Sequence, residues 1–299
     1  MSLRPPRLRR CWLFLPGAER AALLAAAGHG ADVLIQELED FTPPERRADA
    51  RALMAEVLGA WRKSGAIAAV RINPLYTEDG PHDLRAAVEA GAQIVMIPKV
   101  RGPEDVAALD RAIAAIENQR GLPREAIEIV PNIESAAALT KTQAIAGASA
   151  RVSACLVASE DMAADLGAQR SPGGEELSYV RQRFLVECVA AKVVAIDCPF
   201  TWRDEAGCAA AAAQAARWGF VAKSAVSLAQ VAPINAAFTP SAQQIAKARG
   251  IVSAFEAARE RGQAGVEYEG SFVERPIYIN AQRLLARAKA LNDEQGRVR

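Results

Sequence analysis

The chain has 299 residues, of which 51% are hydrophobic and 24% are charged, and this composition is that of a globular protein with a large core. Its 36 Lys and Arg residues balance 35 Asp and Glu residues, so the net charge of +1 gives no bulk attraction to nucleic acid or to an anionic membrane. The presence of only two histidines disfavours His-rich zinc sites and Ser-His-Asp catalysis.

The five cysteines are odd in number and form no Cys-x-x-Cys pair, so we expect no disulfide framework and a reducing, cytoplasmic location. No apolar stretch reaches the roughly 18 residues of a membrane span. The basic N-terminus before residues 11–15 resembles the start of a signal peptide, but this apolar run is too short for one and Pro16 ends it. We therefore expect a first strand there and no membrane partner.

Eight short apolar runs alternate with longer amphipathic or Ala-rich stretches. The runs lack an apolar–polar alternation, which is typical of strands that are covered on both faces in parallel sheets. The expected strands are 11–15, 33–38, 67–72, 94–97, 127–133, 152–158, 193–196 and 220–225. The expected helices are 18–27, 44–63, 82–90, 103–119, 135–145, 175–191, 205–218 and 228–236.

Glycines mark several of the joints between these elements. Gly30, Gly65, Gly91 and Gly219 each end an expected helix just before an apolar run, where glycine adopts the left-handed conformation without a Cβ penalty. A βα unit that is counted eight times predicts an α/β fold, a TIM (β/α)8 barrel over residues 1–238, rather than an open doubly wound sheet. The glycine motifs of dinucleotide-binding folds and of P-loop nucleotide-binding proteins are absent from the sequence, which disfavours both classes.

Residues 239–299 continue beyond the eighth unit. We expect a helix that Ser241 caps and that ends near Arg261, then a mobile glycine-rich loop over 262–276, then a last helix over 277–291. No break in composition separates this segment from the barrel. It is therefore interpreted as a C-terminal helical extension with a lid loop, within the same domain.

Nearly every expected strand ends in a charged or amide residue. In a TIM barrel these ends converge on one rim, where such folds keep their chemistry. Together they predict a polar pocket of mixed charge between apolar walls. The residues are Glu37, Glu39, Asp40, Arg71, Asn73, Lys99, Asn132, Glu134, Ser159, Glu160, Asp161, Asp197 and Lys223.

Glu134 and Asp161 follow the fifth and sixth expected strands, which are neighbours in a barrel. Two adjacent carboxylates repel each other unless a cation or a proton lies between them. The cation that fits this chain is Mg²⁺, which takes one or two carboxylates together with water and substrate oxygens. The alternative is that both acids only favour the N-termini of helices, and this explains each acid alone better than both together.

Arg71 lies near the end of the third expected strand, where a buried guanidinium needs an anion. It can bind a substrate carboxylate or pair with Glu37 or Glu39, and such a partner would also orient it for a ligand. Glu39 and Asp40 fit equally well as acids beside the site or as part of a loop before two prolines. Lys99 could form a Schiff base with a carbonyl substrate, but an ion pair at the rim is favoured.

Seven short segments, spread over almost the whole chain, share their order and spacing with one known family. They are Arg9–Gly17, Leu38–Asp40, Val70–Leu75, Ile97–Val100, Asn132–Ser135, Ser159–Gly167 and Asn235–Ser241. In these segments the chain resembles the HpcH/HpaI aldolase and citrate lyase β-subunit family.

The resemblance implies a Mg²⁺-dependent carbon–carbon lyase on a TIM barrel, which cleaves a citryl-CoA, malyl-CoA, methylmalyl-CoA or related hydroxy acid through an enolate. It also implies a homo-oligomer, a trimer or hexamer, in which Glu274 lies where CoA-thioester lyases carry an acid that reaches from a C-terminal lid into a neighbouring subunit's site. There Glu274 would move a proton. The resulting assignment is Arg71, Glu39, Asp40 and Glu274 for catalysis, Arg71, Asn73, Lys99, Ser159 and Glu160 for substrate binding, and Glu134 and Asp161 for the metal.

The chain departs from the family pattern at several positions. Glu37 stands where many members of the family carry an Asp, and Glu274 stands where the CoA-thioester lyases carry one. Ser227 and Leu228 replace a His-Pro pair after the eighth strand. These changes spare the predicted metal ligands and bear on the substrate and on the use of CoA. Two alternatives therefore stay open, a pyruvate-type class II aldolase without CoA and a non-catalytic subunit that binds acyl-CoA or a partner protein.

Overall fold

The computed structural model describes residues 3–123 and 125–298. The chain forms two compact units, Met1–Phe238 and Thr239–Arg299. Among the described residues, none of the helices combines the length and the hydropathy that crossing a bilayer requires.

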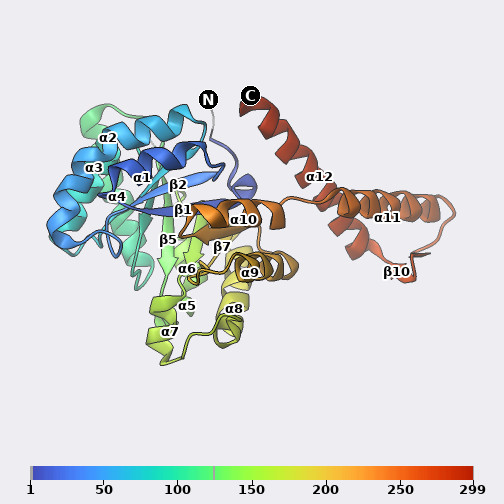
Figure 1. The fold of residues 1–299 in the computed structure, drawn as a ribbon. Coiled ribbons are helices and arrows are strands. Elements are labelled where there is room, and N and C mark those ends of the chain that lie inside the picture. Colours follow the sequence, from blue (N-terminus) through green and yellow to red (C-terminus); the bar gives the residue numbers. More distant parts are fainter. Residues whose placement is uncertain (1–2, 124, 299) are drawn as a thin grey trace. The chain divides into compact units, whose positions relative to one another are not determined.

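The first unit is a closed barrel of eight parallel strands, in which each strand pairs with the next along the chain and β8 pairs with β1 (Figure 1). This confirms the predicted TIM barrel. The strands are β1 (Cys11–Pro16), β2 (Val33–Glu37), β3 (Ile67–Arg71), β4 (Ile94–Ile97), β5 (Glu128–Ile133), β6 (Ala154–Val157), β7 (Val194–Asp197) and β8 (Ala222–Ala225).

Ten α-helices accompany the strands of the first unit as described (Figure 1). They are α1 (Arg20–Ala25), α2 (Arg47–Lys63), α3 (Asp79–Glu89), α4 (Pro103–Arg120), α5 (Ala136–Leu139), α6 (Thr142–Ala146), α7 (Glu160–Leu166), α8 (Ser178–Ala190), α9 (Glu205–Trp218) and α10 (Val231–Ala237). The prediction of a single helix over 135–145 was wrong, because Lys141 is not helical and separates α5 from α6. The seven-residue α7 was missing from the list of expected helices, although the alternative interpretation of Asp161 already placed the N-terminus of a helix there.

The barrel has two apolar layers. One fills its interior and includes Trp12, Phe14, Ile35 and Met96, and the other lies between the strands and the helices. The strands are therefore buried on both faces, which explains their continuous apolar runs. Because apolar side chains fill both layers, the polar side chains of this region lie at the carboxyl ends of the strands.

The glycine joints have the predicted conformation. Gly30, Gly65, Gly91 and Gly219 have φ values of 80°, 84°, 79° and 111°, in the left-handed region that favours glycine. Each lets a helix end and the next strand begin within two or three residues. The repeated joint thus keeps the carboxyl ends of the strands at the same rim.

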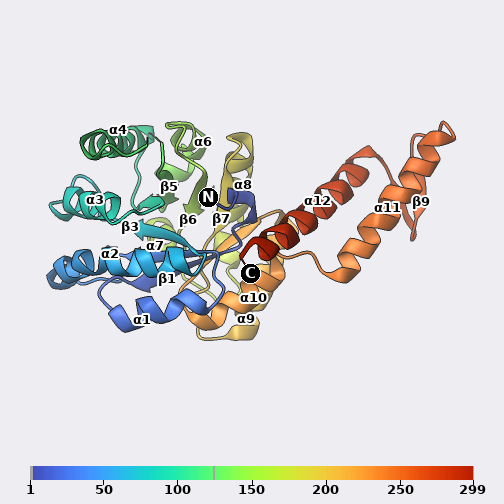
Figure 2. The same ribbon diagram turned by 90° about the horizontal axis from the view of Figure 1, so that it is seen from above.

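The second unit consists of α11 (Ala242–Glu260), the antiparallel hairpin of β9 (Val266–Tyr268) and β10 (Ser271–Val273), and α12 (Arg275–Val298). Ser241 caps α11 as expected, in a capping box with Gln244. The helices α11 and α12 pack against each other (Figure 2), with Phe255 stacked on Tyr278 at 4.7 Å between ring centroids.

The segment 262–276, expected to be a loop, contains a β-hairpin and the start of the last helix. Glu269 and Gly270, with φ values of 48° and 74°, form a tight turn, and Tyr268 pairs with Ser271 across it. The glycines in this stretch therefore serve a hairpin turn. The last helix also begins earlier than expected, at Arg275.

Candidate active site

A cavity of about 390 Å³ opens among the loops that follow β3, β4, β5 and β6. Its lining residues are Tyr76, Lys99, Val100, Arg101, Glu134, Ser135, Asp161 and Asp165. Lys99, Glu134 and Asp161 were predicted from sequence to converge here. The cavity occupies the rim at which TIM barrels carry their active sites.

Glu134 directly follows β5 and is almost fully buried, yet neither of its carboxylate oxygens accepts a hydrogen bond from a described residue. Burial raises the pKa of Glu134 to about 7, and the negative charges of Asp161 and Glu39 add to this rise while Arg71 opposes it. Asn132, which lies two residues earlier on β5, is also buried with its amide atoms unpartnered. Buried acceptors without partners are costly and indicate a missing ligand.

Asp161 is half-buried in the first turn of α7 and lines the same cavity as Glu134. The two acids follow β6 and β5, which pair directly in the barrel. Among the described residues there is no group of three or more His, Cys, Asp or Glu that could hold a metal. Two hard carboxylates fit Mg²⁺, which completes its coordination with water and substrate oxygens.

Arg71 ends β3 opposite Glu37 of β2, and its Nε donates a hydrogen bond to Glu37 Oε1 at 2.8 Å. Its Nη2 lies 3.4 Å from carboxylate oxygens of both Glu39 and Asp40, and its Nη1 lies 3.9 Å from Glu134 Oε1. Burial by itself would lower the pKa of Arg71, but the surrounding carboxylates outweigh this and raise it. The buried guanidinium therefore stays charged.

Aromatic rings flank the same guanidinium. Its central carbon lies 5.2 Å from the ring centroid of Phe14 and 5.9 Å from that of Phe41. The expected ion pair of Arg71 with Glu37 and Glu39 is present, and the rings and carboxylates together restrict its rotation. Nη1 remains on the side of Glu134, where a ligand would lie.

Lys99 follows β4 and extends its ammonium group to Glu39, with Asp40 Oδ1 at 3.3 Å. Burial would lower the pKa of Lys99, but these two acids outweigh it and raise the pKa. A protonated amine is a poor nucleophile, so the geometry agrees with the favoured ion pair and disfavours a Schiff base. The backbone of Lys99 has a φ of 51°, which is uncommon for a residue with a Cβ.

The pKa values of the two acids on the β2 loop are shifted in opposite directions. Burial raises the pKa of Glu39 in spite of Arg71 and Lys99. At Asp40, burial is outweighed by the same two cations, so its pKa is lowered. Both acids therefore lie beside the cavity as expected, with the proton held more readily on Glu39.

Asn73 has the contacts of a structural residue. Its amide nitrogen donates to the carbonyl oxygen of Leu38 at 2.9 Å and to Asp83 Oδ2 at 2.8 Å. These bonds tie the loop after β3 to the loop after β2 and to α3. Asn73 does not line the cavity, and its role in substrate binding stays a prediction.

Ser159 and Glu160 also lie outside the lining of the cavity. Ser159 is buried at the start of α7, and Glu160 Oε1 accepts hydrogen bonds from Arg170 Nε at 3.3 Å and from Thr201 Oγ1 at 2.9 Å. The first turn of α7 thus directs Asp161 to the cavity and Glu160 to the loop after β7. Glu274 is exposed directly after β10 in the second unit.

The sequence did not predict Tyr76 and Arg101 as part of this pocket. Arg101 stacks over the ring of Tyr76 at 4.5 Å, and both are loop residues that the predicted set of polar residues at the strand ends did not include. Asp197 and Lys223, by contrast, form a buried ion pair at 2.7 Å, to which Arg181 adds two hydrogen bonds. This pair stabilises β7 and β8 and leaves no free group for chemistry.

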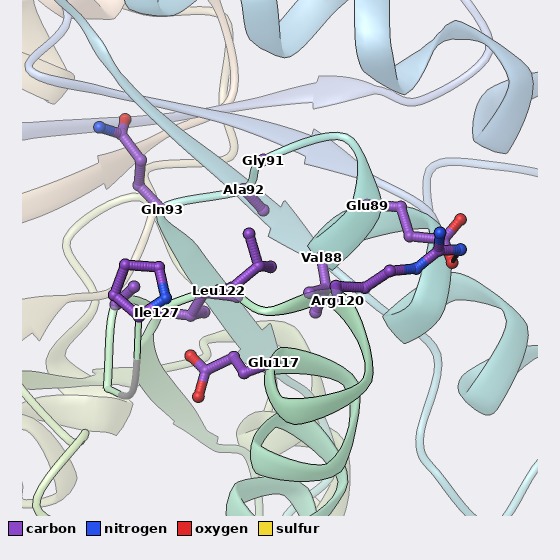
Figure 3. Close-up of a pocket in the computed structure, with 11 residues that line it drawn as sticks. Val88, Glu89, Gly91, Ala92, Gln93, Glu117, Arg120, Leu122 and Ile127 are labelled. Atoms are coloured by element: carbon purple, nitrogen blue, oxygen red, sulfur yellow. Dashed lines mark hydrogen bonds and ion pairs between the residues drawn. The ribbon is translucent and has the colours of Figure 1, made fainter.

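A second cavity, of about 450 Å³, lies at the opposite ends of the strands, where the α3–β4 and α4–β5 loops meet. Most of its lining is apolar, and Glu89 and Arg120 pair at its edge (Figure 3). Glu117 lines it too, but both oxygens of that carboxylate are bound by Arg151. This cavity offers no free catalytic group, so the rim cavity is the candidate active site.

Comparison with known proteins gives the same picture of the chain. Residues 10–227 match the model of the HpcH/HpaI aldolase/citrate lyase family. The chain is 32% identical to the citrate lyase subunit beta of Leuconostoc mesenteroides subsp. cremoris, over 97% of each chain. It is also 32% identical to the L-malyl-CoA/beta-methylmalyl-CoA lyase of Cereibacter sphaeroides, over 96% of this chain and 97% of that protein.

Solved structures extend the likeness to three dimensions. CitE from Mycobacterium tuberculosis, in complex with magnesium, acetoacetate and coenzyme A, is 26% identical with a TM-score of 0.75, over 94% of this chain and 98% of that chain. A citrate lyase from Burkholderia xenovorans LB400, at 21% identity, shares the fold with a TM-score of 0.83 over 95% of this chain and 92% of that chain. With its barrel matched by the family model and its full length by these relatives, the chain belongs to the HpcH/HpaI aldolase/citrate lyase family of carbon–carbon lyases.

Proposed function

We propose that the rim cavity is the active site of a Mg²⁺-dependent carbon–carbon lyase that cleaves a 3-hydroxyacyl-CoA or a related hydroxy acid. The observation that carries this proposal is the buried carboxylate of Glu134, which lacks hydrogen-bond partners beside Asp161 and the fixed guanidinium of Arg71. A cation and an anionic substrate together supply what these groups lack.

Glu134 and Asp161 would hold the metal. When bound, Mg²⁺ supplies a Lewis acid that stabilises negative charge on oxygens of the reacting fragment. Arg71 binds the carboxylate of that fragment, because it remains charged and its guanidinium is already oriented by Glu37. Restricting the rotation of this group before the substrate arrives lowers the entropic cost of reaching the reactive geometry.

Cleavage requires two proton movements. A base takes the proton of the substrate hydroxyl, the O–H electron pair forms a new carbonyl, and the electron pair of the broken C–C bond leaves an enolate that accepts a proton from an acid. We assign one of these transfers to Glu274. Lys99, oriented by Glu39 and Asp40, supplies a second positive charge at the cavity for anionic oxygens of the substrate.

Two of the reported relatives support a CoA thioester as the substrate. One is a malyl-CoA/methylmalyl-CoA lyase, and CitE from M. tuberculosis binds coenzyme A together with magnesium and acetoacetate. We therefore place malyl-CoA, methylmalyl-CoA and citryl-CoA first as substrates, with a homo-oligomer as the active form. A class II aldolase that uses free hydroxy acids is distinguished by the same assay.

The test is a lyase assay with malyl-, methylmalyl- and citryl-CoA and with the free hydroxy acids, each with and without Mg²⁺. We expect Mg²⁺-dependent cleavage of a CoA thioester, and near-complete loss of it in Asp161→Asn, which removes one carboxylate from the metal site. The control is Asp204→Asn, at an exposed N-terminal cap of α9 where Asn caps equally well. Full turnover by Asp161→Asn with Mg²⁺ present would contradict the metal assignment.

A further inference from the structure

Glu37 is the last residue of β2 and is completely buried, and three hydrogen-bond donors converge on its carboxylate. Oε1 accepts from Arg71 Nε at 2.8 Å and from the backbone N–H of Glu39 at 2.6 Å. Oε2 accepts from the backbone N–H of Phe41. One carboxylate thus holds both the side chain of Arg71 and the backbone of the loop that follows β2.

Three residues on this loop, Glu39, Asp40 and Phe41, lie against the guanidinium. Glu39 and Asp40 each lie 3.4 Å from Arg71 Nη2, and both also bind Lys99. Phe41 places its ring 5.9 Å from the same guanidinium. Glu37 therefore bonds Arg71 directly and is linked to Lys99 through Glu39 and Asp40.

The backbone of Glu37 is fixed as firmly as its side chain. Its carbonyl oxygen accepts hydrogen bonds from Gly17 N at 2.9 Å and from the hydroxyl of Thr42. The strand register places Glu37 directly beside Arg71. A shift of the backbone at Glu37 would therefore disturb its contacts with the segment after β1 and its pairing with β3.

We propose that Glu37 is a positioning residue that makes the cavity selective for substrates with a carboxylate, by holding Arg71 and the 38–41 loop in one arrangement. This inference rests on the proposed role of Arg71 in binding a substrate carboxylate. Neither Glu37 nor Arg71 is among the residues that line the cavity, but Arg71 Nη1 lies 3.9 Å from Oε1 of the lining residue Glu134, so Glu37 acts through Arg71.

The chemistry of the three donors explains why a carboxylate fits this position better than an amide. A glutamine at this position offers one acceptor oxygen, and its NH₂ group would face an N–H donor from Arg71 or from the loop. An aspartate keeps the charge but is shorter by one methylene, about 1.5 Å, and cannot reach all three donors without movement. Glu37→Gln is therefore the disruptive variant, and Glu37→Asp is the conservative one.

The experiment measures binding of pyruvate, and of its neutral analogue pyruvamide, by calorimetry with saturating Mg²⁺ in the full-length protein. We expect Glu37→Gln to weaken pyruvate binding by about tenfold or more, as for other partners that orient a ligand group, with little change for pyruvamide. The preference for the carboxylate should therefore fall. Glu37→Asp should recover part of that preference.

The matched control is Glu117→Gln, which also removes a fully buried glutamate that pairs with an arginine, Arg151, away from the rim cavity. It should lower the melting temperature and leave the pyruvate preference unchanged. An unchanged preference in folded Glu37→Gln, or an equal loss for both ligands, overturns the inference. If Glu37→Gln does not fold, Glu37→Asp decides, because wild-type preference in that variant contradicts a requirement for all three bonds.

Arg71→Gln separates this inference from the proposed function. If Arg71→Gln binds pyruvate as tightly as the wild type, the proposed role of Arg71 fails and the inference fails with it. If Arg71→Gln loses binding while Glu37→Gln keeps the full preference, only the positioning role is wrong. Loss of preference in both variants, with Glu117→Gln unaffected, supports both.

Discussion

At the scale of single residues, carboxylates outnumber cations in the candidate site. Arg71, Lys99 and Arg101 are the cations, and the carboxylates are Glu37, Glu39, Asp40, Glu134, Asp161 and Asp165. An anionic substrate would meet net repulsion in such a cavity unless positive charge is added. A divalent cation at Glu134 and Asp161 supplies that charge, which links metal binding to substrate binding.

The pKa of Glu134 predicts how Mg²⁺ affinity depends on pH. With a pKa of about 7 in the folded protein, Glu134 is protonated below this pH, so metal and proton compete for the same oxygens. We expect Mg²⁺ affinity to fall by about tenfold per pH unit below 7 and to level off above 7. Calorimetry between pH 5.5 and 8.5 measures this.

Buffers of different ionisation enthalpy provide the internal control for that measurement. At pH 6, Mg²⁺ binding should release about one proton, and at pH 8 almost none. The raised pKa of Glu134 also makes the stability of the folded protein depend on pH. Because the folded pKa lies above the unfolded value, the contribution of Glu134 is stabilising at low pH and is lost as pH rises through 7 in the absence of metal. Affinity that does not vary with pH would show that Glu134 is not a ligand.

The sequence predicted those site residues that can be recognised by their position at the end of an expected strand. Arg71 ends an apolar run, and Glu134, Lys99 and Asp161 each follow one within four residues, so the barrel topology brings these residues to one rim. It did not predict the role of Glu37, because the three donors on this carboxylate come from segments whose contacts only the folded backbone creates.

At the scale of elements, the eight strands could be predicted because both of their faces are buried and the apolar runs stand out. The hairpin 266–273 could not, because its strands are three residues long and mostly exposed, so they carry no apolar run. The same holds for α7, which is too short to show a helical period. An element can thus be predicted from this sequence when enough of its side chains are buried to produce a recognisable apolar pattern.

The joint between β1 and α1 gives a prediction at this scale. A Cβ on Gly17 would lie 2.4 Å from the carbonyl oxygen of Glu37, so alanine at this position must displace the end of β2. We expect Gly17→Ala to lower the free energy of unfolding by about 1–3 kcal/mol and to weaken pyruvate binding, as measured by urea denaturation and calorimetry. Gly28→Ala is the matched control, because a Cβ there meets nothing within 4 Å. Equal stability of the two variants would contradict the tight contact.

At the scale of the whole molecule, the proposed chemistry draws on both compact units. The metal and carboxylate groups belong to the barrel, and Glu274 belongs to the unit Thr239–Arg299. If an active site takes Glu274 from a neighbouring copy, a variant lacking the metal ligand and a variant lacking this acid can complement each other.

We expect Asp161→Asn and Glu274→Gln each to be nearly inactive, and their mixture to recover part of the lyase activity after the oligomers exchange subunits. Mixed oligomers then contain sites with an intact metal pair from one copy and an intact Glu274 from another. Light scattering on the same samples measures the oligomeric state. No recovery after confirmed exchange, or a monomeric active enzyme, would contradict a shared site.

The left-handed backbone of Lys99 has a consequence for any redesign of this protein. Glycine would adopt the φ of 51° without steric cost, whereas a side chain there raises the energy by about 1 kcal/mol or more. A search for thermostabilising substitutions that scores only the conformational energy of the backbone would therefore choose glycine at position 99. That substitution would remove the ammonium group from the cavity. At position 99, the residue that favours thermal stability therefore differs from the residue that the proposed catalysis needs.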